Sequence, residues 1–217
     1  MSLRNVIEAC QDFVMPLRCV FCGTRTLADE QHICGGCLGD LPWSDAPVLS
    51  ARPGLNCVIA PLAYEFPIDA AVKALKFRRR LHYGPAFAQL LCRASRDLPD
   101  DIDAVLPVPL HWRRKWWRGF NQALEIAQPL ASFLDLPVCG AVRRRRATPP
   151  QSGLTARQRA NNLRAAFCAV RRPCYRHVLV VDDVITTGAT TSQLAKVLRR
   201  AGVAKVSAIA VARSGQR

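Results

Sequence analysis

The chain of 217 residues is long enough for one ordinary domain and a small appended module, and 50% of its residues are hydrophobic. This composition excludes global disorder, and no segment reaches the ~18 uncharged apolar residues of a transmembrane helix. The net charge is +15, and residues 111–217 carry the whole excess, with 20 Lys and Arg against 4 Asp and Glu. A segment with this excess of positive charge is expected to bind an anionic partner. The alternative is a solvated basic surface that has no partner, which would show the same charge excess.

Residues 1–15 predict a short amphipathic helix, because apolar residues recur on one helical face and Ser2 is placed to cap it. Glu8 and Asp12 interrupt the apolar stretch and no small-residue cleavage site follows, so no signal peptide is expected. A docking helix is favoured over a membrane-surface helix because the polar face carries both signs of charge. Ten cysteines without a signal peptide indicate a reducing compartment, and the sequence predicts a cytoplasmic protein.

Four cysteines form the pattern C-x2-C-x11-C-x2-C. They are Cys19, Cys22, Cys34 and Cys37. Each pair offers two thiolates to one ion, and two pairs give the tetrahedral coordination of a structural Zn²⁺ site with no open position. A redox-active C-x-x-C is the alternative, but two pairs within one short segment argue against it. Residues 16–40 are too few to bury a core of their own, so we expect the metal to hold this segment together.

The remainder of the chain alternates between strand and helix patterns. Residues 1–50 are expected to form the N-terminal helix and zinc module, residues 41–54 a Pro-rich linker, and residues 51–217 the main domain. Strands are predicted over 57–64, 103–108, 137–142, 177–182 and 205–212, and helices over 68–77, 84–96, 120–134, 155–165 and 189–201. Pro129 is expected to kink or end its helix. Apolar strands that alternate with helices predict an α/β fold with a parallel sheet covered on both faces.

The segment "VLVVDDVITTGAT" at 178–190 places two acids and a run of threonines after a buried strand. We expect the loop to begin at Asp182 and the next helix to begin after Gly188, where free backbone amides can bind a phosphate. Asp182 and Asp183 would then accept hydrogen bonds from vicinal sugar hydroxyls or bind a divalent cation. A phosphate and a diol recognised together describe a ribose 5-phosphate, whereas a plain crossover loop would not explain adjacent acids. No Walker loop is present.

The same segment resembles the phosphoribosyl pyrophosphate (PRPP) binding motif of type I phosphoribosyltransferases. The resemblance to one family, the ComF family, extends over nearly the whole chain, through "LPVPLHWRRKWWRGFNQALEIA" at 106–127, the arginine-rich stretch 143–167 and the four-cysteine module. These are competence-associated, phosphoribosyltransferase-like proteins, some of them linked to uptake or use of external DNA. The resemblance implies a type I phosphoribosyltransferase fold behind a small zinc module, with PRPP as ligand and other DNA-uptake or DNA-processing proteins as partners.

The resemblance also implies roles for individual residues. Asp182 and Asp183 would bind the ribose hydroxyls of PRPP, with Mg²⁺ nearby. The residues implied around the 5-phosphate are Thr186, Thr187, Gly188, Ala189 and Thr190, and those implied at the pyrophosphate are Val108, Pro109, Arg145 and Arg146. Oxopurine-salvage enzymes of this fold carry an aspartate where this chain has Thr186, so hypoxanthine or guanine salvage is not expected. Ammonia transfer is not expected either, because the N-terminal module cannot supply a glutaminase domain.

The segment 111–122, "HWRRKWWRGFNQ", interleaves aromatic and basic residues. Bases stack on exposed aromatic rings while guanidinium groups neutralise phosphates, so the segment is a candidate for binding single-stranded nucleic acid. The candidate residues are Arg113, Arg114, Lys115, Trp116, Trp117 and Arg118. In the alternative interpretation, the tryptophans cover the sheet edge and the basic groups are only solvated.

Two functions therefore remain open from the sequence. One is Mg²⁺-dependent transfer of phosphoribose from PRPP to an unknown acceptor, with release of pyrophosphate. The other is a non-catalytic, PRPP-responsive protein that binds single-stranded DNA. No residue stands out as a general base, which leaves the enzymatic function undecided at this stage.

Overall fold

The computed structural model describes residues 17–27, 30–48, 54–145 and 166–215. The predicted helices over 1–15 and 155–165, and Arg146, lie outside the described residues. The chain divides into two compact units, Met1–Leu41 and Pro42–Arg217, somewhat before the boundary at residue 50 that the sequence suggested. Within the described residues, no helix is both long and apolar enough to cross a membrane.

The first unit has little apolar interior. Its described helix, α2 (Gly35–Gly39), follows the third cysteine of the pattern, and an isolated antiparallel bridge joins Arg18 and Arg25. Only a few of its described apolar side chains are buried, among them Ile33 and Leu41. A unit of this size cannot be stabilised by hydrophobic burial alone, so another interaction, such as metal binding by the cysteines, is needed to stabilise it.

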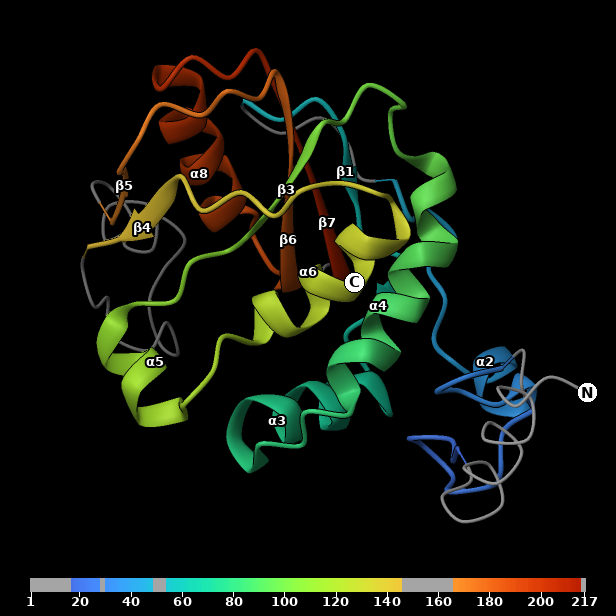
Figure 1. Cartoon of the computed structure of the whole chain (residues 1–217). Coiled ribbons are helices and arrows are strands. Elements are labelled where there is room, and N and C mark those ends of the chain that lie inside the picture. Colours follow the sequence, from blue (N-terminus) through green and yellow to red (C-terminus); the bar gives the residue numbers. More distant parts are fainter. Residues whose placement is uncertain (1–16, 28–29, 49–53, 146–165, 216–217) are drawn as a thin grey trace, which may run out of the picture. The chain divides into compact units, whose positions relative to one another are not determined.

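The second unit is built on a parallel sheet in the order β1 (Val58–Ile59), β7 (Lys205–Arg213), β6 (His177–Ile185) and β3 (Ala104–Pro107). A further short strand, β2 (Leu62–Ala63), also pairs with β7. Strands β6 and β7 run side by side through the centre of the sheet (Figure 1). Nearly all of their residues are buried, as expected for the central strands of a sheet covered on both faces.

Helices cover both faces of this sheet (Figure 1). α4 (Tyr83–Ala94) and α6 (Gln122–Phe133) pack together and against the strands, and α8 (Ala189–Arg200) packs against β7 and the short strand β5 (Phe167–Ala169). Alternate side chains of β6 pack on opposite faces of the sheet. On one face, Val178 and Val180 belong to the same core cluster as Leu194 and Leu198 of α8. The remaining helices are α3 (Ile68–Arg78), α5 (Trp112–Arg118) and a 3₁₀ turn, η1 (Ser95–Asp97). The predicted fold class is confirmed.

Most of the predicted elements are confirmed with shifts of a few residues, but the strand over 137–142 is largely wrong. Val138 makes only an isolated bridge with Val105. Gly140, two residues later, weakens a strand because it has no side chain to pack. The strand that does form, β4 (Val142–Arg144), pairs antiparallel with β5 outside the main sheet. The strand over 57–64 is divided into β1 and β2, and Pro61, which has no N–H to donate, lies at the break.

One helix forms where none was predicted, and another continues past its proline. A seven-residue helix, α5, occupies part of the aromatic–basic segment, for which no helix was predicted. Pro129 does not end α6, which continues to Phe133. Proline at this position removes the hydrogen bond to the Glu125 carbonyl. That carbonyl lies beside Gly84 of α4, where a Cβ atom would be 3.1 Å from the oxygen, so the two helices approach closely there.

Candidate functional site

The two adjacent acids lie within a strand rather than at the start of a loop. β6 continues to Ile185, which pairs with Arg213 of β7, so the predictions that the strand ends at residue 182 and that the loop begins at Asp182 are wrong. The physical reason is that β7 is equally long and supplies hydrogen-bonding partners beyond the acids. The two carboxyl groups are close together but have different neighbours, since Asp182 lines the cavity of the following loop and Asp183 contacts Lys76.

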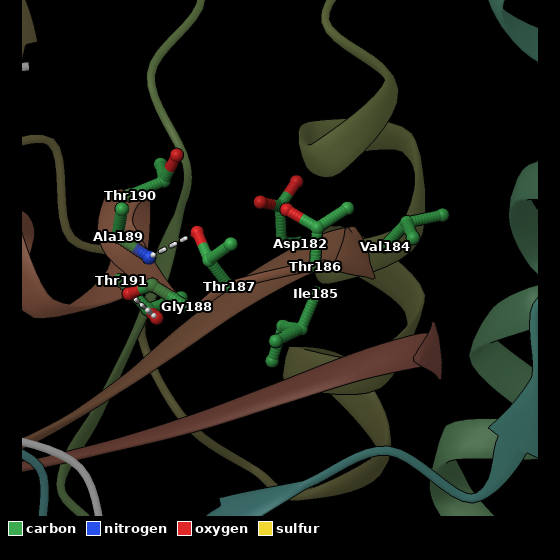
Figure 2. Close-up of a pocket in the computed structure, with 9 residues that line it drawn as sticks. All are labelled: Asp182, Val184, Ile185, Thr186, Thr187, Gly188, Ala189, Thr190 and Thr191. Carbon is green, nitrogen blue, oxygen red and sulfur yellow. Dashed lines mark hydrogen bonds between the residues drawn. The ribbon is translucent and has the colours of Figure 1, made fainter. Parts of the chain in front are cut away.

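Asp182 faces the loop that connects β6 with α8. It lines a cavity with the residues that follow it, shown in Figure 2: Val184, Ile185, Thr186, Thr187, Gly188, Ala189, Thr190 and Thr191. Gly188, with φ of 72°, is the N-cap of α8 and provides no side-chain cap. The Ala189 N–H donates to Thr187 Oγ1 at a long 3.4 Å, Gly188 adds no cap, and this end of the helix is electropositive. The loop has the features of an anion site.

Asp183 is buried and forms an ion pair with Lys76 of α3. Burial lowers the pKa of Lys76, but the charges of Asp183 and Asp182 outweigh this effect and raise the pKa overall. Burial, followed by the negative charge of Asp183, raises the pKa of Asp182 well above its ordinary value. Lys76 thus supplies the compensating charge beside the acid pair.

A second cavity, of about 230 Å³, adjoins the first and shares Asp182 and Thr190 with it. Its other lining residues come from α3, the segment after β3, α5, α6 and β4: Lys76, Phe77, Val108, Pro109, Leu110, Arg114, Arg118, Gln122 and Arg144. Four cationic side chains therefore surround a cavity whose lining includes one carboxylate, that of Asp182. A site with this charge balance favours a ligand that carries several negative charges.

The segment after β3 is fixed by the start of α6. The Nδ2 atom of Asn121 donates to the Val108 carbonyl at 3.1 Å, and its Oδ1 atom accepts from the Ala123 N–H at 3.3 Å. Asn121 is therefore both the cap of α6 and the support of the cavity wall at Val108 and Pro109. Val108 and Pro109 were predicted from the sequence, whereas Asn121 was not.

Of the described arginines at 143–145, Arg144 lines the cavity, whereas the resemblance implied Arg145 and Arg146. Arg145 is exposed and its N–H donates to the Ala166 carbonyl at 2.7 Å. Alternation along β4 explains the difference, because Arg144 is on the same face as the buried Val142. That period of two was available in the sequence and would have separated Arg144 from its neighbours.

Lys76 was also missed by the sequence analysis. It lies four residues after Val72, which is fully buried, so helical periodicity places both on the inward side of α3. Lys73, by contrast, pairs with Asp69 at 2.6 Å on the exposed side of the helix. The sequence signal that could have identified Lys76 is a lysine placed by helical periodicity on the buried side of an amphipathic helix.

The aromatic–basic segment forms a helix with two different faces. Trp112, Trp116 and Trp117 are 63%, 85% and 67% exposed, so the alternative that they cover the sheet edge is wrong. Arg113 and Lys115 are exposed beside them. Arg79 donates from Nη2 to the Trp117 carbonyl at 3.2 Å, which brings the arginine run 78–80 next to α5. Together these residues form an exposed aromatic and basic surface.

Arg114 and Arg118 do not belong to that exposed surface. They lie on the opposite side of α5 and line the cationic cavity. Arg118 is buried, donates from Nη1 to Oε1 of Gln122 at 2.6 Å, and lies 5.5 Å from the ring centre of Phe77. Their prediction as nucleic-acid contacts is therefore corrected: one residue of α5 in each helical turn serves the cavity instead.

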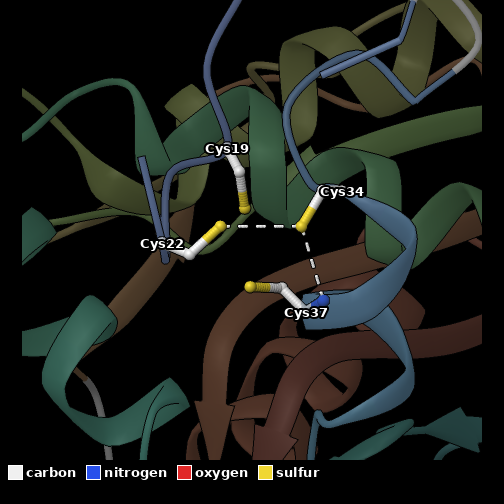
Figure 3. Close-up of side chains that lie close together, drawn as sticks. All are labelled: Cys19, Cys22, Cys34 and Cys37. Atoms are coloured by element: carbon white, nitrogen blue, oxygen red, sulfur yellow. Dashed lines mark hydrogen bonds between the residues drawn. The ribbon is translucent and has the colours of Figure 1, made fainter. Parts of the chain in front are cut away.

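The four patterned cysteines converge in the first unit (Figure 3). All of their sulfur atoms lie within 4.8 Å of one another, and Sγ of Cys22 is 3.6 Å from Sγ of Cys34. A tetrahedron with metal–sulfur bonds of ~2.3 Å has edges of about 3.8 Å, so the cluster has the dimensions of a metal site. The Cys37 N–H donates to the Cys34 sulfur at 3.5 Å, a second-sphere bond typical of such knuckles.

The protonation of these cysteines supports the same interpretation. Hydrogen bonds from the side chain and backbone of Thr24 lower the pKa of the Cys22 thiol to about 6. Cys22 is therefore largely a thiolate at neutral pH, which is the form that binds metal ions. Burial raises the pKa of Cys37, so a bound cation would have to displace its proton. The cluster can hold a metal such as zinc.

A family model identifies the class of the second unit. Residues 121–217 match the model of the phosphoribosyl transferase domain, which spans the acid pair, the threonine loop and α8. The solved structure of glutamine PRPP amidotransferase from B. subtilis, complexed with ADP and GMP, is 21% identical and aligns with a TM-score of 0.45 over 64% of this chain and 30% of that chain. On the basis of the family model, the second unit contains a phosphoribosyltransferase-type domain.

Two curated proteins are similar over most of their length. Competence protein F of Haemophilus influenzae is 36% identical over 208 residues, which are 90% of this chain and 84% of that protein. DNA utilization protein YhgH of Escherichia coli is 35% identical over 197 residues, which are 87% of this chain and 86% of that protein. The chain belongs to the family of these proteins, the ComF family.

Proposed function

We propose that the chain binds PRPP with Mg²⁺ in the two joined cavities, and that this activity serves the uptake or use of external DNA. The observation that carries the proposal is the junction at Asp182 and Thr190, where the threonine loop meets a cavity lined by four cations. PRPP has a phosphate at one end and a pyrophosphate at the other end of a ribose. Its two charged ends match the two cavities, and its hydroxyls match the acid between them.

The roles of the residues follow from this orientation. The 5-phosphate binds to the threonine loop and the first N–H groups of α8, and the ribose hydroxyls donate to Asp182 and Asp183. The pyrophosphate lies among Lys76, Arg114, Arg118 and Arg144, beside the wall formed by Val108 and Pro109. Mg²⁺ bound to the pyrophosphate would neutralise part of its charge and polarise the bond to the leaving group. The link to DNA use rests on the names of the relatives.

Transfer of the phosphoribosyl group requires an acceptor, and the lining residues limit its chemistry. Among the described residues that line the cavities, Asp182 is the carboxylate, and histidine is absent. The segment 146–165 contains no Asp, Glu or His in its sequence. An acceptor that must lose a proton before attack would have to use Asp182 or supply its own base. Positioning and charge stabilisation would then account for most of the catalysis.

Pyrophosphate release decides between transfer and binding alone. The protein is incubated with Mg²⁺ and PRPP and with a panel of nucleobases and amines, and pyrophosphate is monitored. Release that depends on one acceptor supports a transferase. Tight PRPP binding without release in any mixture supports the non-catalytic alternative. Failure to bind PRPP contradicts both forms of the proposal.

The exposed side of α5 supports a second activity, the binding of single-stranded DNA. Trp112, Trp116 and Trp117 offer ring faces for stacking, and Arg113 and Lys115 offer charges for phosphates. Arg79 joins this surface through its hydrogen bond to Trp117. The surface lies on the same helix as two cavity arginines, so PRPP and DNA would bind to opposite sides of α5.

Stacking and charge should contribute to DNA binding in separable ways. Replacing Trp116 and Trp117 with Ala is expected to weaken binding by roughly 1–3 kcal/mol per stacked base without changing its salt dependence. Replacing Arg113 and Lys115 with Ala should flatten the log–log salt slope by about 0.7 per lost phosphate contact. Fluorescence anisotropy of a labelled oligonucleotide at several salt concentrations measures both, with Phe133→Ala, an exposed aromatic on α6, as control. Unchanged affinity and slope in both variants would place the DNA elsewhere.

A further inference from the structure

The Asp183 carboxylate already has a cationic partner. Asp183 is only 3% exposed, its side chain lies beside that of Asp182, and the Lys76 ammonium contacts its Oδ2 atom. Since the proposed site requires both acids to accept ribose hydroxyls, Lys76 competes with the ligand for one of them.

Lys76 is held at this position by its helix. The inward side of α3 is anchored by Ile68, Val72 and Leu75, each fully buried. The Lys76 side chain is 23% exposed and lines the cationic cavity together with Arg114, Arg118 and Arg144, which in the proposed function receive pyrophosphate. The same ammonium is therefore adjacent to a carboxylate on one side and to the anion cavity on the other.

Separation of this pair without compensation is unfavourable. An unpaired charge left in a buried position is strongly destabilising, so the lysine leaves Asp183 only if another anion receives it. A ligand with a phosphate at the threonine loop alone brings no charge into the cavity that Lys76 lines. A ligand with a pyrophosphate does, and charge-assisted hydrogen bonds to phosphate are among the strong ones.

We propose that Lys76 is a specificity-determining residue, through which the site binds PRPP, with its pyrophosphate, in preference to a ligand that has the 5-phosphate alone. In the free protein it occupies Asp183, and the arriving pyrophosphate draws the ammonium away and frees that carboxylate for the ribose. Ribose 5-phosphate, which lacks the pyrophosphate, cannot displace the lysine and binds poorly. This inference rests on the proposed PRPP site and adds the means by which the site rejects the truncated ligand.

Opposite changes in the affinities for two ligands test the inference. Calorimetry with Mg²⁺ measures the binding of PRPP and of ribose 5-phosphate to the wild type, Lys76→Met, Lys76→Arg and Lys73→Met. In Lys76→Met, PRPP is expected to bind more weakly by roughly 10-fold or more, because a charge-assisted contact is lost. Ribose 5-phosphate is expected to bind more tightly, because Asp183 is free. Lys76→Arg should retain the wild-type preference, and Lys73→Met, on the exposed side of α3, should match the wild type.

The possible outcomes are distinguishable. A wild type that binds no PRPP overturns the proposed function and this inference with it. A wild type that binds PRPP, with both affinities lowered equally in Lys76→Met, shows that Lys76 is only a pyrophosphate ligand and overturns the inference alone. Circular dichroism checks the fold of each variant. If Lys76→Met does not fold, Lys76→Gln, which can still donate to Asp183, is measured in its place. A ratio of the PRPP affinity to the ribose 5-phosphate affinity that equals the wild-type ratio in that variant overturns the inference.

Discussion

A protein with both Asp182→Asn and Asp183→Asn is expected to lose PRPP binding while it keeps its fold. Amides have almost the same shape as carboxylates, but they lack the negative charge that strengthens the hydrogen bonds from the ribose hydroxyls. Two charge-assisted bonds of ~1.5–3 kcal/mol each correspond to a loss of at least about 100-fold in affinity. Calorimetry with Mg²⁺ measures the affinity, and circular dichroism measures the fold.

Pyrophosphate alone provides the internal control for this variant. The double substitution removes the negative charge of the acid pair and leaves Lys76 without its partner, so affinity for free pyrophosphate should be retained or rise. Asp69→Asn, on the exposed side of α3, serves as the matched control and should bind PRPP as the wild type does. Unaltered PRPP affinity in a folded double variant would contradict the assignment of the acid pair.

The framework of the second unit could be predicted because its signals are local. Continuous apolar runs gave β6 and β7, and a period of 3.6 residues gave α3, α4, α6 and α8. The motif at 178–190 brought the acids and the threonines to the carboxyl end of a central strand, where the structure also has them. These patterns require no knowledge of which residues meet from distant parts of the chain.

The charges of the cavity could not be predicted in the same way. Lys76 and Arg144 come from elements more than sixty residues apart, and only the packing of α3 and the β4–β5 hairpin brings them to Asp182. The sequence analysis chose arginines by their position in a run, where each is equivalent to its neighbour. The structure distinguishes them by face: Arg144 points into the cavity and Arg145 lies in solvent. The two sides of α5 were merged for the same reason.

The acid pair illustrates a different limit. From the sequence, Asp182 and Asp183 are two equivalent carboxylates at the start of a loop. In the structure the strand continues past them, and one carboxylate faces the threonine loop while the other pairs with Lys76. Where a strand ends depends on how far its neighbour accompanies it, and that is a property of the sheet rather than of the segment.

Joint replacement of Cys22 and Cys37 with Ser is expected to abolish metal binding and to unfold the first unit. We propose that one Zn²⁺ per chain is bound by Cys19, Cys22, Cys34 and Cys37, whose sulfur atoms already lie within 4.8 Å of one another. Serine hydroxyls remain protonated at neutral pH and bind zinc poorly, and losing one ligand from each pair leaves neither knuckle intact. Structural zinc contributes on the order of 10 kcal/mol in small sites, far more than the few buried apolar residues of this unit can replace.

Elemental analysis of protein purified without chelator measures the metal, and resistance to proteolysis within residues 17–41 measures the state of the unit. The second unit has its own core around β6 and β7, so its thermal transition should persist in the variant. Cys168→Ser with Cys174→Ser, two cysteines outside the cluster, is the matched control and should retain full zinc. Zinc retained in the Cys22 and Cys37 double variant, or a wild type with no metal, would contradict the site. A chelator removes the ion without changing the sequence. Treatment of the wild type with chelator should therefore reproduce the proteolysis of the double variant, and the Cys168 and Cys174 variant should respond to chelator as the wild type does.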